Sequence, residues 1–302
     1  MKILCAVDDS DVSHLAIQGM GSLFRSSVKE IILLHVVDSH VVHRGRKPTA
    51  SETKVLSGVS RKIQEQGKKL LHGCAERLTT ILGQGRTGSL PVIKLMLVKG
   101  HVSDTILQWS EKTGVDCLTM GSRGISDVPG YLLGSVSRKL VTHALCSVFM
   151  VKGPVSVPFP VMIALDGSKS STYAARIVQA WLNPDEVSLC LVSVVPDRLT
   201  DLASQLLGKR QLMALMKPIR RSAQDLLKEY REKFLKVGFR VTTALLEGHP
   251  PDQILQAAEH QQAGLVCLGS KGLSGVERFT MGSVSEWVST YSPLSILVVR
   301  HS

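Results

Sequence analysis

The 302-residue sequence is poor in aromatic residues, which make up only 4% of it. A hydrophobic core must therefore be built mainly from Val, Leu, Ile and Ala, although 44% of the residues are hydrophobic. Charged residues make up 20% of the chain, a balance typical of a folded globular protein. No apolar run is long enough to span a membrane, and the first one ends at Asp8, too early for a signal peptide. We expect a cytoplasmic protein without a membrane partner.

Metal-binding and disulfide patterns are also missing. The six cysteines include no Cys-x2-Cys pair, and most of them lie within or beside apolar runs. Buried, reduced thiols that behave as small hydrophobic residues explain this distribution. His40 and His43 have metal-ligand spacing but lie in a polar segment without further ligands nearby. The sequence therefore predicts neither a redox centre nor a structural metal site.

Acidic residues are in deficit, with 25 Asp and Glu against 36 Lys and Arg, which gives a net charge of +11. Such an excess favours anionic partners in general, and nucleotides are among them. No arginine-rich run with interleaved aromatic residues is present, so nucleic acid is not the expected partner.

A glycine pattern of fixed spacing, Gly-x2-Gly-x9-Gly-Ser, occurs once in each half of the sequence. Each copy follows an apolar run typical of a buried strand and precedes a segment with helical periodicity. Glycines let backbone N–H groups approach a ligand, and a helix start supplies unpaired donors, so the arrangement suits phosphate binding. Turn glycines in a duplicated fold are the alternative, but they do not explain why all four positions recur together. The copies are Gly121, Gly124, Gly134 and Ser135, and Gly269, Gly272, Gly282 and Ser283.

Short apolar runs alternate with helical segments throughout both halves. We expect strands at residues 3–7, 31–37, 92–98, 115–120 and 148–152, and again at 161–165, 187–195, 241–246, 265–268 and 296–299. A Pro/Gly linker at 153–158 predicts two domains, residues 1–153 and 158–302. The alternation predicts an α/β fold of two tandem, doubly wound parallel sheets.

The two halves differ in length before their glycine patterns. Asp8 and Asp166 are 158 residues apart, whereas Gly100 and Gly248 are 148 apart. We expect the ten extra residues of the first half in the polar loop 38–53 and in the helix 54–82 that follows it. In doubly wound sheets, ligands bind beyond the carboxyl ends of the strands. Residues that follow strands, such as Asp8 and Gly100, should therefore meet the glycine loop at that edge.

Several motifs resemble other sites but lie in the wrong context. Residues 83–88 spell Gly-x-Gly-x-x-Gly, yet they follow a helix and precede a strand, the reverse of a dinucleotide-binding turn. Residues 264–271 resemble a Walker A motif, but the lysine is one place late, and the residues between the glycines read as an apolar strand rather than a loop. His101 and His249 begin helices with Asp in the first turn, which indicates local packing rather than a ligand role.

The motifs together resemble the universal stress protein family over nearly the whole chain, as two tandem domains. The resemblance rests on residues 3–8, 33–38, 115–124 and 132–137, and on residues 164–168, 268–275, 281–285 and 296–299. It implies a Rossmann-like fold of the adenine nucleotide alpha hydrolase type, with strand order 3-2-1-4-5. The glycine pattern marks the members of this family that bind ATP.

The resemblance also implies the residues of two nucleotide sites. The four positions of each glycine pattern would contact phosphate and ribose, a following valine would add its backbone N–H, and a strand-end carboxylate would lie near the nucleotide. The second strand would meet the adenine edge, the third would end at the site, and a cation in the loop would add positive charge. Besides the pattern residues, the candidates are Asp8, Val36, Gly100, Arg123 and Val136 in the first half, and Asp166, Val194, Gly248, Lys271 and Val284 in the second.

The first half departs from the family pattern more than the second. Asp9 stands where the second half has Gly167, and Pro129 interrupts the loop, so we expect ATP first at the second site. The last strands of the two halves are apolar edges, which are unstable when unpaired. We predict that they pair within the chain as a pseudo-dimer, with a homodimer as a further option; crosslinking that places these edges apart would exclude the pairing.

The leading hypothesis is an ATP-binding universal stress protein, with Mg²⁺ accompanying the nucleotide, that acts as a stress-response switch. No positioned general base stands out, so no catalytic residue is assigned and hydrolysis should be slow. One alternative is a nucleotide-free scaffold of the same fold that binds an unknown protein partner. Another is a slow adenine-nucleotide hydrolase, in which phosphate release would depend on Asp8 or Asp166.

Overall fold

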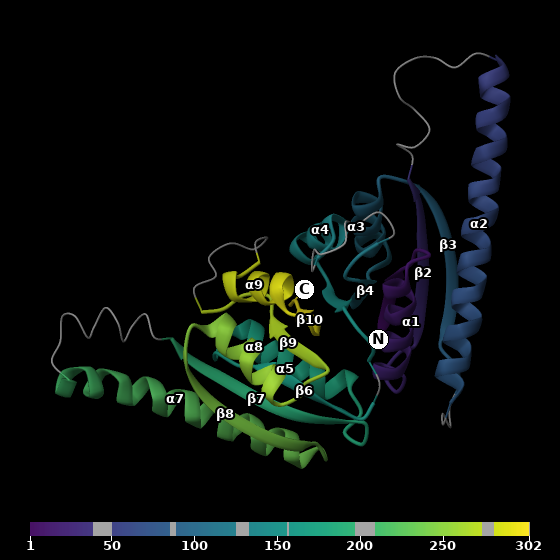
Figure 1. Ribbon diagram of the computed structural model, residues 1–302. Helices are drawn as coiled ribbons and strands as arrows, with labels where there is room; N and C mark the ends of the chain where they lie inside the picture. The colour runs from purple at the N-terminus through teal and green to yellow at the C-terminus, as the bar shows by residue number, and fades with distance from the viewer. Residues whose placement is uncertain are drawn as a thin grey trace. The chain divides into compact units, whose positions relative to one another are not determined.

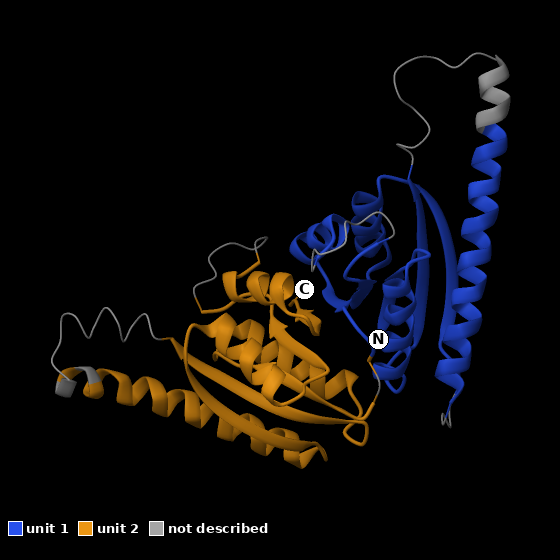
Figure 2. Cartoon of the chain, in the orientation of Figure 1, with its two compact units in different colours: residues 1–154 blue, residues 155–302 orange. Residues whose placement is uncertain are grey.

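The computed structural model describes residues 1–38, 50–84, 89–124, 133–155, 157–196, 209–273 and 281–301. The chain forms two compact units, residues 1–154 and 155–302 (Figure 2). In each unit, helices cover both faces of a parallel sheet (Figure 1). The predicted α/β class is therefore confirmed.

Unit 1 contains five strands and four described helices. Its strands lie in the order β3-β2-β1-β4-β5 and are all parallel, as the predicted order 3-2-1-4-5 requires. Helices α1 and α2 cover one face of the sheet, and α3 and α4 cover the other. The elements are β1 (Lys2–Ala6), α1 (Asp11–Leu23), β2 (Glu30–Asp38), α2 (Ala50–Gly83), β3 (Val92–Gly100), α3 (Val102–Thr113), β4 (Cys117–Gly121), α4 (Ser135–His143) and β5 (Ser147–Val151).

Unit 2 repeats this architecture. Its strands lie in the order β10-β9-β6-β7-β8, which is the same order read from the opposite edge. Helices α5 and α7 lie on one face, and α8 and α9 lie on the other. The elements are β6 (Phe159–Ala164), α5 (Lys169–Trp181), β7 (Val187–Pro196), α7 (Lys209–Lys236), β8 (Arg240–Gly248), α8 (Pro250–His260), β9 (Leu265–Gly269), α9 (Ser283–Tyr291) and β10 (Ser295–Val299).

The central strands form the core because helices cover both of their faces. Ile3, Leu4 and Cys5 of β1 are completely buried, and every residue of β4 and β9 is buried. Such strands are continuous apolar runs rather than alternating ones. Strand β3 lies at a sheet edge, where Val92 is 58% exposed, and this position explains its weaker apolar pattern.

The apolar runs around most of the cysteines predicted that their thiols would be buried. Five of the six thiols are buried and Cys146 is half-buried, and none of the six forms a disulfide. Burial raises the pKa values of Cys5, Cys117 and Cys267 above that of an ordinary thiol. These side chains therefore act as small hydrophobic core residues. Among the described residues, no helix has the length and apolar character needed to cross a membrane.

The extra residues of unit 1 lie partly elsewhere than expected. Helix α2 has 34 residues and α7 has 28, and the connection from helix to strand is also longer in unit 1, at 84–91 against 237–239. The segments before these helices, 39–49 and 197–208, are nearly equal in length. The prediction of a longer helix is therefore confirmed, but the prediction of a longer polar loop is wrong. Helix α2 also begins at Ala50, within the segment expected to be a loop.

Candidate functional site

The carboxyl ends of the strands bring most of the predicted residues to one edge of each sheet. In unit 1, β1 pairs in parallel with β2 and with β4, so Asp8, Val36 and Gly121 lie at the same edge. Asp38 pairs with Gly100 in the register of β2 and β3, which places Gly100 there as well. In unit 2, the corresponding residues are Asp166, Val194, Gly248 and Gly269.

The first glycine of each pattern is required by a close contact with a helix. A Cβ atom at Gly269 would lie 2.5 Å from the carbonyl carbon of Ser170 and 2.7 Å from the amide nitrogen of Ser171. At Gly121 it would lie 3.0 Å from the carbonyl carbon of Val12. Backbone atoms cannot rotate away as a side chain can. These glycines therefore have a structural role, because they let the strand end approach the helix that follows the first strand of its unit.

The third glycine closes the base of the loop. Gly134 donates its N–H to the carbonyl oxygen of Ser122 at 2.9 Å, and Gly282 donates to Ser270 at 2.8 Å. Both glycines are also helix N-caps, of α4 and α9 respectively. The start and end of each loop are thus held together, which fixes the helix start beside the strand end.

Two buried serines, which the sequence analysis did not single out, anchor these helices to the strands. Ser137 Oγ donates to the carbonyl oxygen of Gly121 at 2.9 Å, and Ser285 Oγ donates to that of Gly269 at 2.6 Å. The predicted Ser135 and Ser283 are exposed at the first helical positions instead. A signal was present in the sequence, because Ser-Val-Ser follows the third glycine in both halves.

The helix starts of α4 and α9 differ from those of α1 and α5. Ser10 caps α1 by accepting from the Ser13 amide at 3.2 Å, and Ser168 caps α5 by accepting from the Ser171 amide at 3.1 Å. Glycine N-caps have no side chain with which to do this, so the first amides of α4 and α9 keep their capacity to bind an anion. These first amides belong to the exposed Ser135 and Ser283 and to the half-buried Val136 and Val284 that follow them.

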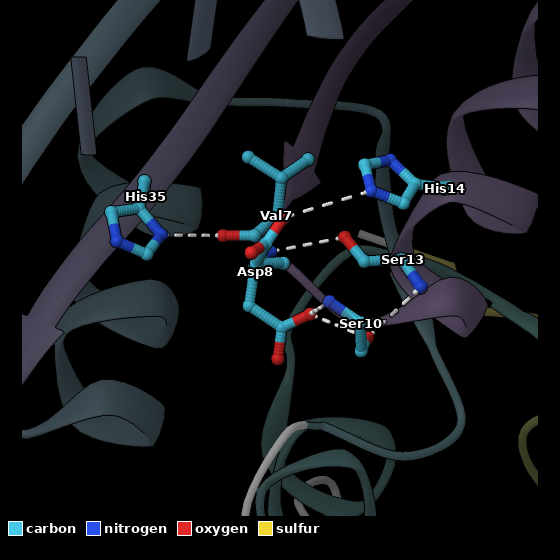
Figure 3. A network of polar contacts seen from close by, with 7 residues as sticks. Val7, Asp8, Ser10, Ser13, His14 and His35 are labelled. Atoms are coloured by element: carbon cyan, nitrogen blue, oxygen red, sulfur yellow. Dashed lines mark hydrogen bonds and ion pairs between the residues drawn. The ribbon is translucent and has the colours of Figure 1, made fainter. Parts of the chain in front are cut away.

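In unit 1 the strand-end carboxylate is bound by its own turn (Figure 3). Asp8 Oδ1 accepts from the amide of Ser10 at 3.2 Å and from its hydroxyl at 2.6 Å. His35, which the sequence analysis did not single out, places Nδ1 2.7 Å from the carbonyl oxygen of Val7. Asp9 is 80% exposed, and its Oδ1 lies 3.9 Å from His14 Nε2. The second carboxylate therefore points to solvent.

In unit 2 the strand-end carboxylate lies against the glycine loop. Asp166 Oδ1 accepts from the amide of Ser168 at 2.9 Å, while a Cβ atom at Gly272 would lie 3.0 Å from Asp166 Oδ2. The Ser168 hydroxyl donates to the carbonyl oxygen of Lys271 at 3.3 Å. Lys271 is half-buried, whereas Arg123 at the same position in unit 1 is exposed. The structure thus brings together the carboxylate, the second glycine and the loop backbone.

Gly124 follows the exposed Arg123 in unit 1 and is half-buried. The remaining site residues, Gly100 and Gly248, both approach the next helix. A Cβ atom at Gly100 would lie 2.3 Å from Thr105 Oγ1, and Gly248 has a φ of +136° beside Gln253. The absence of a side chain is therefore needed at both positions for packing.

Some of the motifs that resemble other sites lie within the described residues. His101 Nδ1 lies 3.0 Å from Asp104 Oδ2, and His249 Nδ1 lies 2.9 Å from Asp252 Oδ2, each at a helix start. This geometry supports the local packing role. Residues 265–269 form β9, so the Walker-like segment is a strand. His40, His43, Pro129 and most of the Gly-x-Gly-x-x-Gly segment lie outside the described residues.

The fold and the site define a tandem, doubly wound α/β protein with a glycine loop at the carboxyl edge of each sheet. The model of the universal stress protein family matches residues 1–152 and 159–300. The chain therefore belongs to the universal stress protein family, and it contains two such domains.

Relatives of this family align with the whole chain or with part of it. Universal stress protein Rv2623 of Mycobacterium tuberculosis is 24% identical over 319 residues, which cover 100% of this chain and 97% of that protein. Universal stress protein YxiE of Bacillus subtilis is 28% identical over 158 residues, or 50% of this chain and 98% of that protein. The crystal structure of a universal stress protein from Archaeoglobus fulgidus matches with a TM-score of 0.66 and 21% identity, over 100% of this chain and 96% of that one. This last likeness shows the shared fold.

Proposed function

We propose that this universal stress protein binds ATP, together with Mg²⁺, as a nucleotide-dependent switch, and that unit 2 is the tighter site. The observation that carries the proposal is the approach of Gly272 to the Asp166 carboxylate, where a Cβ atom would lie 3.0 Å from Oδ2. The space beside this carboxylate is kept open by a glycine and is bordered by loop backbone. In unit 1, by contrast, the corresponding carboxylate, Asp8, accepts two hydrogen bonds from Ser10.

The groups at the unit 2 edge fit the parts of ATP. The amides that begin α9, at Ser283 and Val284, would hold phosphate oxygens, with Gly282 and Lys271 beside them. The Val194 backbone at the end of β7 would meet the adenine edge. The Asp166 carboxylate is an oxygen ligand of the kind that Mg²⁺ prefers. Bound ATP would supply the triphosphate charge that these donors neutralise.

We propose binding rather than rapid turnover. The groups assigned to the phosphates are backbone amides, hydroxyls and a lysine, which stabilise negative charge. Fast hydrolysis would also need a base placed to take a proton from water. The proposed switch therefore responds to whether its nucleotide site is occupied. Multiple-turnover phosphate release that depends on Asp166 would favour the hydrolase alternative instead.

Calorimetry of the full chain with Mg-ATP tests the proposal. The wild-type protein should bind, and Gly272→Ala should weaken the tighter site by about tenfold, because its methyl group enters the space beside Asp166. The matched variant Gly124→Ala should leave that tighter site unchanged. A wild-type protein that binds no Mg-ATP would reject the proposal and favour the nucleotide-free scaffold.

A further inference from the structure

A cavity of about 240 Å³ lies between α5 and α7 of unit 2. Side chains of both helices line it, so the two helices lie side by side on one face of the sheet. Arg176 and Gln179 of α5 line the cavity, together with Tyr230, Lys233 and Phe234 of α7. Cavities that hold drug-sized ligands measure about 300–1,000 Å³, so this one suits a smaller molecule.

The cavity is separate from the glycine loop. Arg176 lies eight residues beyond Ser168, the N-cap of α5, which is about 12 Å along the helix axis at 1.5 Å per residue. Phe234 is near the carboxyl end of α7, which leads into the amino end of strand β8. The cavity therefore opens on the flank of the unit and not at the carboxyl edge of the sheet.

A comparison with unit 1 shows how the sequence creates this space. In unit 1, Gly21 of α1 allows close packing on α2, since a Cβ atom there would lie 3.0 Å from both Leu78 and Ile81. The corresponding residue of unit 2 is Gln179. One turn earlier, the fully buried Ile17 is replaced by Ala175, which lines the cavity. A longer residue at one position and a smaller one at the other leave α5 and α7 with a gap between them.

The mouth of the cavity carries two positive charges. Lys233 Nζ is 2.5 Å from Glu229 Oε1, and this contact raises the pKa of Lys233, although the neighbouring Arg176 opposes the shift. Among the described residues, Arg176 has no carboxylate partner, and its guanidinium carbon lies 5.9 Å from the ring centroid of Tyr173. Glu229 thus pairs with Lys233 and not with Arg176, so an anion here would find a guanidinium without an ionic partner.

The floor of the cavity is apolar and well packed. Phe234 is 1% exposed and Tyr230 is 6% exposed. The ring of Phe234 meets that of Phe239 edge to face at 5.6 Å, and Lys233 Nζ lies 4.7 Å from the centroid of Tyr230. A ligand that enters would contact these aromatic side chains without having to order them, which reduces the entropic cost of binding.

We propose that this cavity binds a small organic anion, namely a carboxylate joined to a compact apolar ring or chain. The carboxylate pairs with the Arg176 guanidinium, whose planar set of donors matches two carboxylate oxygens. The apolar part lies against Phe234 and Tyr230, and the Gln179 amide adds a polar contact at the rim. This site is independent of the proposed ATP site.

Benzoate is a suitable probe, and its titration into isotopically labelled full-length protein can be followed through backbone amide resonances. We expect millimolar binding, as befits so small a ligand, with shifts concentrated in α5 and α7. Arg176→Gln introduces the residue that unit 1 has at Gln18 and should weaken binding about tenfold or more. Arg231→Gln, an exposed control on α7 that does not line the cavity, should bind as the wild type does.

A second variant tests the space rather than the charge. Ala175→Ile introduces the residue that unit 1 has at Ile17 and should fill the cavity, so that benzoate binding is lost while Arg176 remains. Unchanged benzoate affinity in both Arg176→Gln and Ala175→Ile would overturn the proposal. Inorganic phosphate that binds the cavity as tightly as benzoate would also overturn it, because the apolar floor would then have no role.

Discussion

The two units share one strand order and one glycine spacing, but they close the edge of the sheet differently. In unit 1 the Ser10 hydroxyl donates to Asp8, within a single turn. In unit 2 the Ser168 hydroxyl donates to the carbonyl oxygen of Lys271, across to the glycine loop. The same frame thus directs one serine hydroxyl to its own turn and the other to the loop. A shared motif therefore does not guarantee two equivalent sites.

The outer helices differ in a second way. In unit 1, Lys139 Nζ lies 2.6 Å from Asp104 Oδ1 on neighbouring helices. In unit 2, the position of Lys139 is occupied by Trp287, which is 43% exposed and contacts the ring of Tyr291 at a tilt, with centroids 4.5 Å apart. One unit presents an ionic surface where the other presents an aromatic one. Because these positions lie outside the core, the fold tolerates both.

The largest expected difference between the units concerns the first glycine of each pattern. Gly269→Ala should lower the free energy of unfolding of unit 2 by about 3 kcal/mol, because its methyl group meets backbone atoms. Gly121→Ala should cost unit 1 only about 1–2 kcal/mol, since the nearest atom is farther away and one neighbour is a side-chain methyl. Hydrogen exchange in increasing urea, followed by mass spectrometry, measures each unit separately.

In that experiment, peptides from the unit that carries no substitution serve as the internal control. Equal losses in the two variants would contradict the closer approach of α5 to β9. A loss confined to the wrong unit would contradict the assignment of these contacts.

The next effect concerns the contact between the first two helices of each unit. Gly21→Gln introduces the residue of unit 2 against Leu78 and Ile81, and it should cost about 2–3 kcal/mol through overpacking and a buried amide. The reverse change, Gln179→Gly, should cost about 1 kcal/mol, the usual penalty of glycine within a helix. The same exchange measurement applies. A harmless Gly21→Gln would mean that α1 and α2 are not in close contact.

The sequence was sufficient for the frame of the fold because the frame depends on simple patterns. Buried parallel strands are unbroken apolar runs, as in Ile3–Cys5, and helix starts have recognisable caps such as Ser10. The parallel order then brings strand ends together whatever their distance in the chain. These rules sufficed to place Asp166 and Gly269 at one edge.

The finer contacts could not be predicted, because they depend on how helices rotate and how far apart they lie. Periodicity shows which face of α5 is buried, but not that Gln179 and Ala175 leave a gap beside α7. The different acceptors of Ser10 and Ser168 likewise follow from the turn, in which Gly167 has a φ of +81°. The aligned sequences show Asp9 at the position of Gly167, but they do not show which acceptor each serine hydroxyl would have.

That turn provides the third comparison. Gly167→Ala should cost about 1 kcal/mol, because a residue with a Cβ atom is strained at positive φ. Asp9→Ala should change stability by less than about 0.5 kcal/mol, since Asp9 is exposed and is not among the residues of the described chain with positive φ. Thermal unfolding of both variants beside the wild type measures the difference. Equal effects would imply that the two turns have the same backbone conformation.

The smallest expected effect distinguishes the ionic surface from the aromatic one. The hydrogen bond from Lys139, aided by His101, holds the pKa of Asp104 below its ordinary value of 3.8. A carboxyl group with a lowered pKa in the folded state stabilises that state above its ordinary pKa, and this contribution disappears as the pH falls through the folded value. Lys139→Ala should therefore slightly destabilise unit 1 at neutral pH. The difference in stability between this variant and the wild type should shrink below about pH 3.8 and in high salt.

Trp287→Ala removes ring contacts instead, so its effect on the stability of unit 2 should persist in high salt. Urea midpoints at low and high salt separate the two cases, and a salt-independent Lys139→Ala effect would show that packing of the lysine stem, rather than its charge, stabilises this surface.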